Sequence, residues 1–175
     1  MTFSLSNSYA QPLTHRELVE LTLARGDTDL LAAYDDHPLG YTANGGSLDL
    51  RSEIAALYGP QIGADNILVF PGAQAALPTV AHALTNGHSH SIVFDPAYQS
   101  TQDAPVHAGS QVTRITLRAE DGWQIDPDEV KAAIRESTRL ILVNQPHNPS
   151  GTLMSQKRWQ ALVDIAEEHG MDASS

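Results

Sequence analysis

The sequence contains no cysteine and little positive charge. The lack of cysteine among 175 residues excludes disulfides and cysteine-based metal sites. Lys and Arg together number 10 against 21 Asp and Glu, which gives a formal net charge of −11. This balance argues against nonspecific binding to nucleic acids or to anionic membranes, because both attract positively charged surfaces.

Long apolar runs are also missing. No stretch approaches the length of a membrane span, and the first seven residues lack the basic and apolar regions of a secretion signal. We therefore expect a cytoplasmic protein. The hydrophobic fraction of 41% is ordinary for a soluble globular chain, and 175 residues suffice for one domain with a real core.

Short apolar runs alternate with segments of helical periodicity. Helices are expected at residues 14–26, 47–59, 74–85, 126–136 and 155–170, and strands at 67–70, 91–94, 112–117 and 140–143. The alternation predicts an α/β fold with a mostly parallel sheet and flanking helices. The strand at 112–117 alternates apolar and polar residues, which favours the edge of the sheet.

Residues 144–151 (Asn-Gln-Pro-His-Asn-Pro-Ser-Gly) form the most informative segment. They follow a predicted buried strand, and open α/β sheets bind ligands at the carboxyl ends of their strands. Pro146 and Pro149 stiffen the segment on both sides of Asn148. A stiff loop that presents one amide side chain suits the orientation of a planar ligand. The alternative is that Asn148 only forms an Asx-turn with its own backbone.

Two other strand ends carry candidate ligand contacts. Residues 71–74 join a strand to a helix, and a helix N-terminus offers free N–H groups and a positive dipole end to a phosphate. The alternative is a plain turn. Tyr98 follows Asp95 and Pro96, where an aromatic ring can stack on a flat ligand. It would otherwise be a partly buried tyrosine covering the sheet edge.

Four segments, in order, resemble fold-type I aminotransferases, which use pyridoxal phosphate. They are residues 41–46 (Tyr-Thr-Ala-Asn-Gly-Gly) followed by Leu50 and Arg51, residues 70–76 (Phe-Pro-Gly-Ala-Gln-Ala-Ala), residues 95–98 (Asp-Pro-Ala-Tyr) and residues 144–151. The resemblance covers about residues 38–170. It implies pyridoxal 5′-phosphate as cofactor, an amino acid and a 2-oxo acid as substrates, and a homodimer.

The resemblance also implies roles for single residues. Gly72, Ala73 and Gln74 would hold the cofactor phosphate, mainly through their backbone. Tyr98 would stack on the pyridine ring, and Asn148 would donate to the 3′-oxygen of the ring. Tyr41 would reach the cofactor phosphate of the partner subunit, and Gly40 would lie where the backbone meets the substrate carboxylate. Arg51 is interpreted as a structural helix residue.

The family's chemistry requires a lysine that forms a Schiff base with the cofactor. The only lysines, Lys131 and Lys157, fall on expected surface helices and outside the family's Ser-x-x-Lys context. No catalytic residue is therefore assigned. We expect an N-terminal arm and helix at residues 1–37 and a partial cofactor-binding large domain at 38–175 that stops before the catalytic lysine. The chain alone would then be inactive and only marginally stable.

The expected reaction is transfer of an amino group from an amino acid to a 2-oxo acid. Alternatives are a lyase, decarboxylase or cyclising enzyme of the same fold, or a noncatalytic cofactor-binding half that needs a partner chain. His88 and His90 lack a third ligand nearby, so we expect a solvated loop and no metal. His147 is given no catalytic role.

Overall fold

The structure is a computed structural model that describes residues 10–171. Two compact units, Met1–Ser47 and Leu48–Ser175, are distinguished within the chain. Residues 1–9, which include the first part of the expected N-terminal arm and the seven residues without secretion-signal features, lie outside the described part, as do the last four residues.

The first unit contains two helices, α1 (His15–Arg25) and α2 (Thr28–Asp35). The Thr14 hydroxyl accepts a hydrogen bond from the Glu17 N–H at 3.2 Å, and the Glu17 carboxylate accepts one from the Thr14 N–H at 2.7 Å. The Thr14 N–H and hydroxyl both donate to the Glu17 carboxylate, and these two bonds lower the pKa of Glu17. Gly26 ends the helix with a φ of 82°, a conformation that glycine adopts without strain. The predicted first helix is thus confirmed, while α2 was not predicted.

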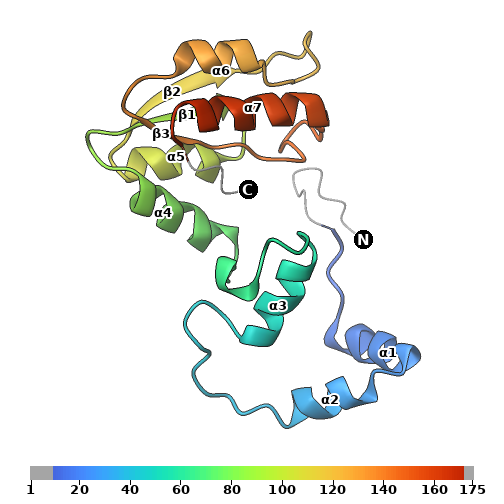
Figure 1. The fold of residues 1–175 in the computed structure, drawn as a ribbon. Coiled ribbons are helices and arrows are strands. Elements are labelled where there is room, and N and C mark those ends of the chain that lie inside the picture. The colour runs from blue at the N-terminus through green and yellow to red at the C-terminus, as the bar shows by residue number, and fades with distance from the viewer. Residues whose placement is uncertain (1–9, 172–175) are drawn as a thin grey trace. The chain divides into compact units, whose positions relative to one another are not determined.

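The second unit is an α/β structure built on a parallel sheet (Figure 1). Along the chain come α3 (Leu48–Ala56), the 3-10 helix η1 (Ala64–Asn66), α4 (Ala73–Leu84), β1 (His90–Asp95), α5 (Gln99–His107), β2 (Gln111–Thr116), α6 (Pro127–Ala133), β3 (Thr138–Ile141) and α7 (Gln156–Glu168). Within the described residues the sheet order is β2-β1-β3, and β1 runs parallel to both neighbours. The predicted fold class is confirmed, and β2 lies at an edge as expected.

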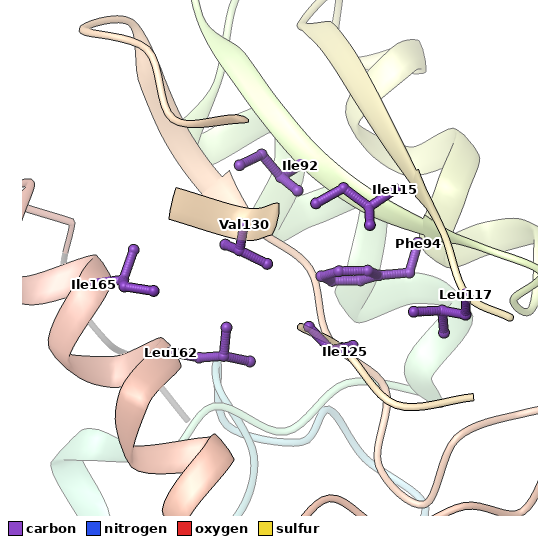
Figure 2. Packing of buried hydrophobic residues seen from close by; sticks show 8 residues of the cluster. All are labelled: Ile92, Phe94, Ile115, Leu117, Ile125, Val130, Leu162 and Ile165. Carbon is purple, nitrogen blue, oxygen red and sulfur yellow. The ribbon is translucent and has the colours of Figure 1, made fainter. Parts of the chain in front are cut away.

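Helices cover both faces of this sheet. α6 and α7 pack on one face, and α4 and α5 lie on the other (Figure 1). The main core lies between the sheet and helices α6 and α7 (Figure 2). Its members come from strands β1 and β2, from the segment after β2, and from both helices. They are Ile92, Phe94, Ile115, Leu117, Ile125, Val130, Leu162 and Ile165. Burying each such side chain stabilises the fold by about 1.5–3 kcal/mol. None of the helices formed by residues 10–171 is both long and apolar enough to cross a membrane.

In the second unit, one predicted strand is absent and the helix α5 was not predicted. Residues 67–70 are not a strand, and Leu68 in this segment is 69% exposed. An apolar run forms a strand only where a neighbour pairs its backbone groups, and no described segment does so here. α5 was missed because its composition is weakly apolar and Pro105 interrupts its pattern.

His90 corrects another expectation, because it does not lie in a solvated loop. His88 is exposed, but His90 begins β1 and is fully buried. Its Nδ1 lies 2.8 Å from the Thr138 hydroxyl on β3, and its Nε2 lies 2.8 Å from the Thr113 hydroxyl on β2. The ring therefore connects all three strands at their amino ends. Burial, and then the positive charge of Arg135, lower the pKa of His90 below its usual 6.5.

The lowered pKa of His90 predicts that acid destabilises the second unit. The unfolded chain has the higher histidine pKa and takes up the proton first, so the free energy of unfolding falls as the pH drops below about 6.5. Chemical unfolding measured between pH 7.5 and 5 should show a weaker pH dependence in His90→Asn than in the unsubstituted chain. His88→Asn, at the exposed position, should keep the original dependence. Equal dependence in all three proteins would contradict this role.

Candidate functional site

The predicted ligand contacts of the second unit lie near the carboxyl ends of strands β1 and β3. β1 and β3 are parallel neighbours, and the pairing continues past β3 because the Leu142 N–H donates to the Ile92 carbonyl at 3.0 Å. The loops that leave these strands, residues 95–98 and 144–151, therefore emerge side by side. Open α/β sheets bind ligands at the carboxyl ends of their strands.

The first turn of α4 presents unpaired backbone donors. Gly72 precedes the helix with φ 91° and ψ 159°. The N–H groups of Ala75 and Ala76 turn back to its carbonyl at 3.1 and 3.3 Å. Within the described residues, the N–H groups of Ala73 and Gln74 make no hydrogen bond. Free donors at a helix N-terminus suit an anion.

The N-terminus of α5 lies beside that of α4. The Gln74 side chain donates from Nε2 to the Ser100 hydroxyl at 3.1 Å, which joins the two first turns. Neither helix has an acidic residue in its first turn, so their positive dipole ends are not neutralised locally. Sequence reasoning missed Ser100 because it did not predict α5.

Tyr98 occupies the position just before α5. Its carbonyl accepts hydrogen bonds from the N–H and hydroxyl of Thr101, at 3.0 and 2.6 Å, which fixes the backbone there. The tyrosine side chain is 49% exposed. It is therefore no buried packing residue, and half of its surface stays accessible to a ligand.

The loop after β3 leaves the amide of Asn148 free. The Asn148 N–H donates to the Asn144 side chain at 3.0 Å, so Asn144 forms the side-chain turn in this loop. The side-chain amide of Asn148 is partly buried and has no hydrogen-bond partner among residues 10–171. A polar group in that setting is available to a ligand.

His147 was given no role from the sequence, yet it is the buried polar residue of this loop. Its Nε2 lies 2.9 Å from the Pro96 carbonyl, and its Nδ1 lies 2.6 Å from the Ser150 hydroxyl. The bracketing prolines signalled a stiff loop, but no local pattern revealed the contact with Pro96, which lies 51 residues earlier.

The remaining candidates belong to other segments of the chain. Gly40 and Tyr41 belong to the first unit, where the Gly40 N–H donates to the Pro38 carbonyl at 2.8 Å and the Tyr41 side chain is fully exposed. Their predicted contacts stay predictions. The Arg51 guanidinium donates to the Ala64 carbonyl at 2.9 Å and so links α3 to η1, as expected of a structural residue.

Both lysines lie on exposed helix surfaces, as predicted. Lys131 on α6 pairs with Glu168 on α7 at 3.0 Å, and Lys157 is exposed on α7. Neither belongs to the loops that carry Tyr98 and Asn148. Across residues 10–171, no group of three His, Asp or Glu side chains is arranged to hold a metal ion.

Comparisons with known proteins point to one family. A family model described as aminotransferase class I and II matches residues 6–171. The arginine–pyruvate transaminase of Pseudomonas aeruginosa is 32% identical over 147 residues, which are 82% of this chain and 37% of that protein. An aspartate aminotransferase of Pyrococcus horikoshii is 31% identical over 144 residues, which are 79% of this chain and 37% of that protein.

Solved structures agree with these relatives. A pyridoxal-phosphate-dependent aminotransferase from Streptococcus suis superposes with a TM-score of 0.80 at 29% identity, covering 88% of this chain and 41% of that one. The chain thus spans about 37% of the length of the two curated relatives.

The backbone at Gly72 yields a stability prediction. A side chain built there meets no atom within 4 Å, but the φ of 91° with extended ψ is one that residues other than glycine rarely adopt. We expect Gly72→Ala to lower the free energy of unfolding by about 1–3 kcal/mol through backbone strain. Gly87→Ala is the control, because Gly87 also has open space but no positive φ. Equal urea midpoints for the two variants would contradict the strain.

Proposed function

We propose that this chain, which belongs to the aminotransferase class I and II family, is the cofactor-binding part of an enzyme that moves an amino group between an amino acid and a 2-oxo acid. The observation that carries the proposal is a set of groups near the carboxyl ends of β1 and β3 that are accessible to a ligand. The N–H groups of Ala73 and Gln74, the ring of Tyr98 and the amide of Asn148 all lie on segments that meet there.

These groups fit pyridoxal 5′-phosphate, the cofactor of the family. The phosphate is a dianion, and the first turn of α4 after Gly72 supplies unpaired N–H donors without a competing carboxylate. Tyr98 offers an aromatic face for the pyridine ring. Asn148 offers an N–H to the negatively charged ring oxygen, and hydrogen bonds to charged groups are the strong ones. When bound, the ring withdraws electrons from the bonds at the Cα of the amino acid.

The roles proposed for the first unit follow from the family resemblance. Gly40 would contact the substrate carboxylate through its backbone. Tyr41 would reach the phosphate held by the partner subunit of a homodimer. Residues 38–175 would form part of the cofactor-binding domain, and the protein would be cytoplasmic. The two relatives are named for different amino acids, so we extend only the reaction class to this chain.

A second proposal concerns the isolated chain, which would hold the cofactor noncovalently and depend on a partner chain for catalysis. The exposed positions of Lys131 and Lys157 support it. A lysine becomes a good nucleophile in an apolar pocket or beside an activating base, and an exposed helix surface provides neither.

The lysines provide the first test of cofactor binding. Lys131→Arg/Lys157→Arg keeps both charges and removes both amines. We expect this variant and the unsubstituted chain to bind pyridoxal phosphate with the same affinity in an absorbance titration. After borohydride reduction, intact mass should show no stoichiometric adduct in the unsubstituted chain. Binding that disappears with the two amines would mean that the cofactor only modifies surface lysines, and the proposed site would fall.

Asn148 provides the second test. Asn148→Asp replaces the amide donor with a carboxylate that repels the ring oxygen. The dissociation constant for pyridoxal phosphate should rise about tenfold or more, since losing a hydrogen bond to a charged group costs about 1.5–3 kcal/mol. Asn86→Asp is the control, because it adds the same charge before β1, at the other end of the sheet. An equal effect of both substitutions would point to net charge and argue against a contact.

A further inference from the structure

His147 is held on both sides of its imidazole ring. The side chain is only 4% exposed. A carbonyl oxygen can only accept, so Nε2 carries a proton and donates it to the Pro96 carbonyl at 2.9 Å. On the other side, Nδ1 and the Ser150 hydroxyl share a hydrogen bond at 2.6 Å. One ring thus spans from the loop after β1 to the loop after β3.

The backbone of the second loop is closed around the same residue. The His147 N–H donates to the Thr152 carbonyl at 2.9 Å, and the His147 carbonyl accepts from the Gly151 N–H at 2.7 Å. The Ser150 hydroxyl that meets Nδ1 also accepts the Thr152 N–H at 3.3 Å. The position of the imidazole is therefore set by its own loop before it reaches across to Pro96.

The bond from Nε2 to Pro96 connects the two loops. In the described part of the chain, no other hydrogen bond joins residues 95–98 to residues 144–151. Pro96 lies two residues before Tyr98, and His147 is the immediate neighbour of Asn148. A change in this bond would therefore alter the separation of Tyr98 from Asn148.

We propose that His147 is a positioning residue that fixes the spacing of Tyr98 and Asn148 through its Nε2–H bond to the Pro96 carbonyl. The inference rests on the proposed function, in which Tyr98 and Asn148 contact the pyridine ring from these two loops. A planar ligand held between a stacking side chain and a single amide donor requires both at a fixed distance. The histidine would act on the ring through its neighbours and would not touch the phosphate.

Two substitutions separate the bond to Pro96 from the bond to Ser150. The amide nitrogen of glutamine reaches about as far from the backbone as Nε2, so His147→Gln can still donate to Pro96. The amide of asparagine reaches only about as far as Nδ1, so His147→Asn keeps a polar group near Ser150 but loses the link between the loops. Both variants replace the imidazole ring with a neutral amide and differ only in its reach, which makes them a matched pair.

The first measurement is backbone hydrogen exchange, which does not depend on a ligand. Peptides covering residues 95–101 and 144–152 should exchange faster in His147→Asn than in the unsubstituted chain or in His147→Gln. Peptides from α7 should exchange alike in all three, which shows that the fold is intact. Unchanged exchange of both loops in His147→Asn would overturn the proposal, whatever the ligand data show.

The second measurement separates ring contacts from phosphate contacts. The dissociation constant for pyridoxal phosphate should rise about tenfold in His147→Asn and stay within about threefold in His147→Gln. Inorganic phosphate, used as a competing ligand, should bind all three alike. A loss of phosphate binding equal to the loss of cofactor binding would indicate general damage to the site and would overturn the positioning role.

A double substitution tests whether His147 acts through Asn148. If it does, His147→Asn should weaken binding little further in an Asn148→Ala background, so the two effects are not additive. Additive effects would overturn the proposed route through Asn148. Absence of any cofactor binding by the unsubstituted chain would overturn the proposed function and the role built on it, while hydrogen exchange would still decide whether His147 joins the loops.

Discussion

The parallel pairing of β1 with β3 is the constraint on which the site depends. Parallel strands have their carboxyl ends on the same side of the sheet, so the loops at residues 95–98 and 144–151 must emerge next to each other. At the opposite end of the strands, His90 bonds to hydroxyls on β2 and β3 and secures this pairing. The sheet thus has a buried polar connection at its amino end and unused polar groups at its carboxyl end.

Local signals were enough to predict much of the fold. The Thr14 cap, the Asp126–Pro127 start of α6 and the Ser155 cap of α7 each act over three residues or fewer, and all three lie where the sequence placed them. The strand predicted at residues 67–70 was wrong because strand formation depends on a pairing partner that composition does not reveal. The solvated loop predicted at His90 was wrong for a related reason, since the side chain is buried against threonines 23 and 48 residues away.

The same limit applies to the site. The turn at Gly72 and the loop around Asn148 were recognisable because their residues are contiguous. The sequence could not show that Asn144, and not Asn148, forms the side-chain turn, because either amide suits it. Ser100 and His147 were missed because their partners, Gln74 and Pro96, lie 26 and 51 residues away. Contacts of that kind arise from tertiary packing.

The unpaired N–H groups of Ala73 and Gln74 tie ligand concentration to folding. They point in one direction only while α4 is formed, so an anion that bonds to both binds the native chain and not the unfolded one. By mass action, such a ligand raises the free energy of unfolding by about 2.7 kcal/mol when it is present at a hundred times its dissociation constant. The amount of folded protein in a cell would in that case rise and fall with the concentration of such a ligand.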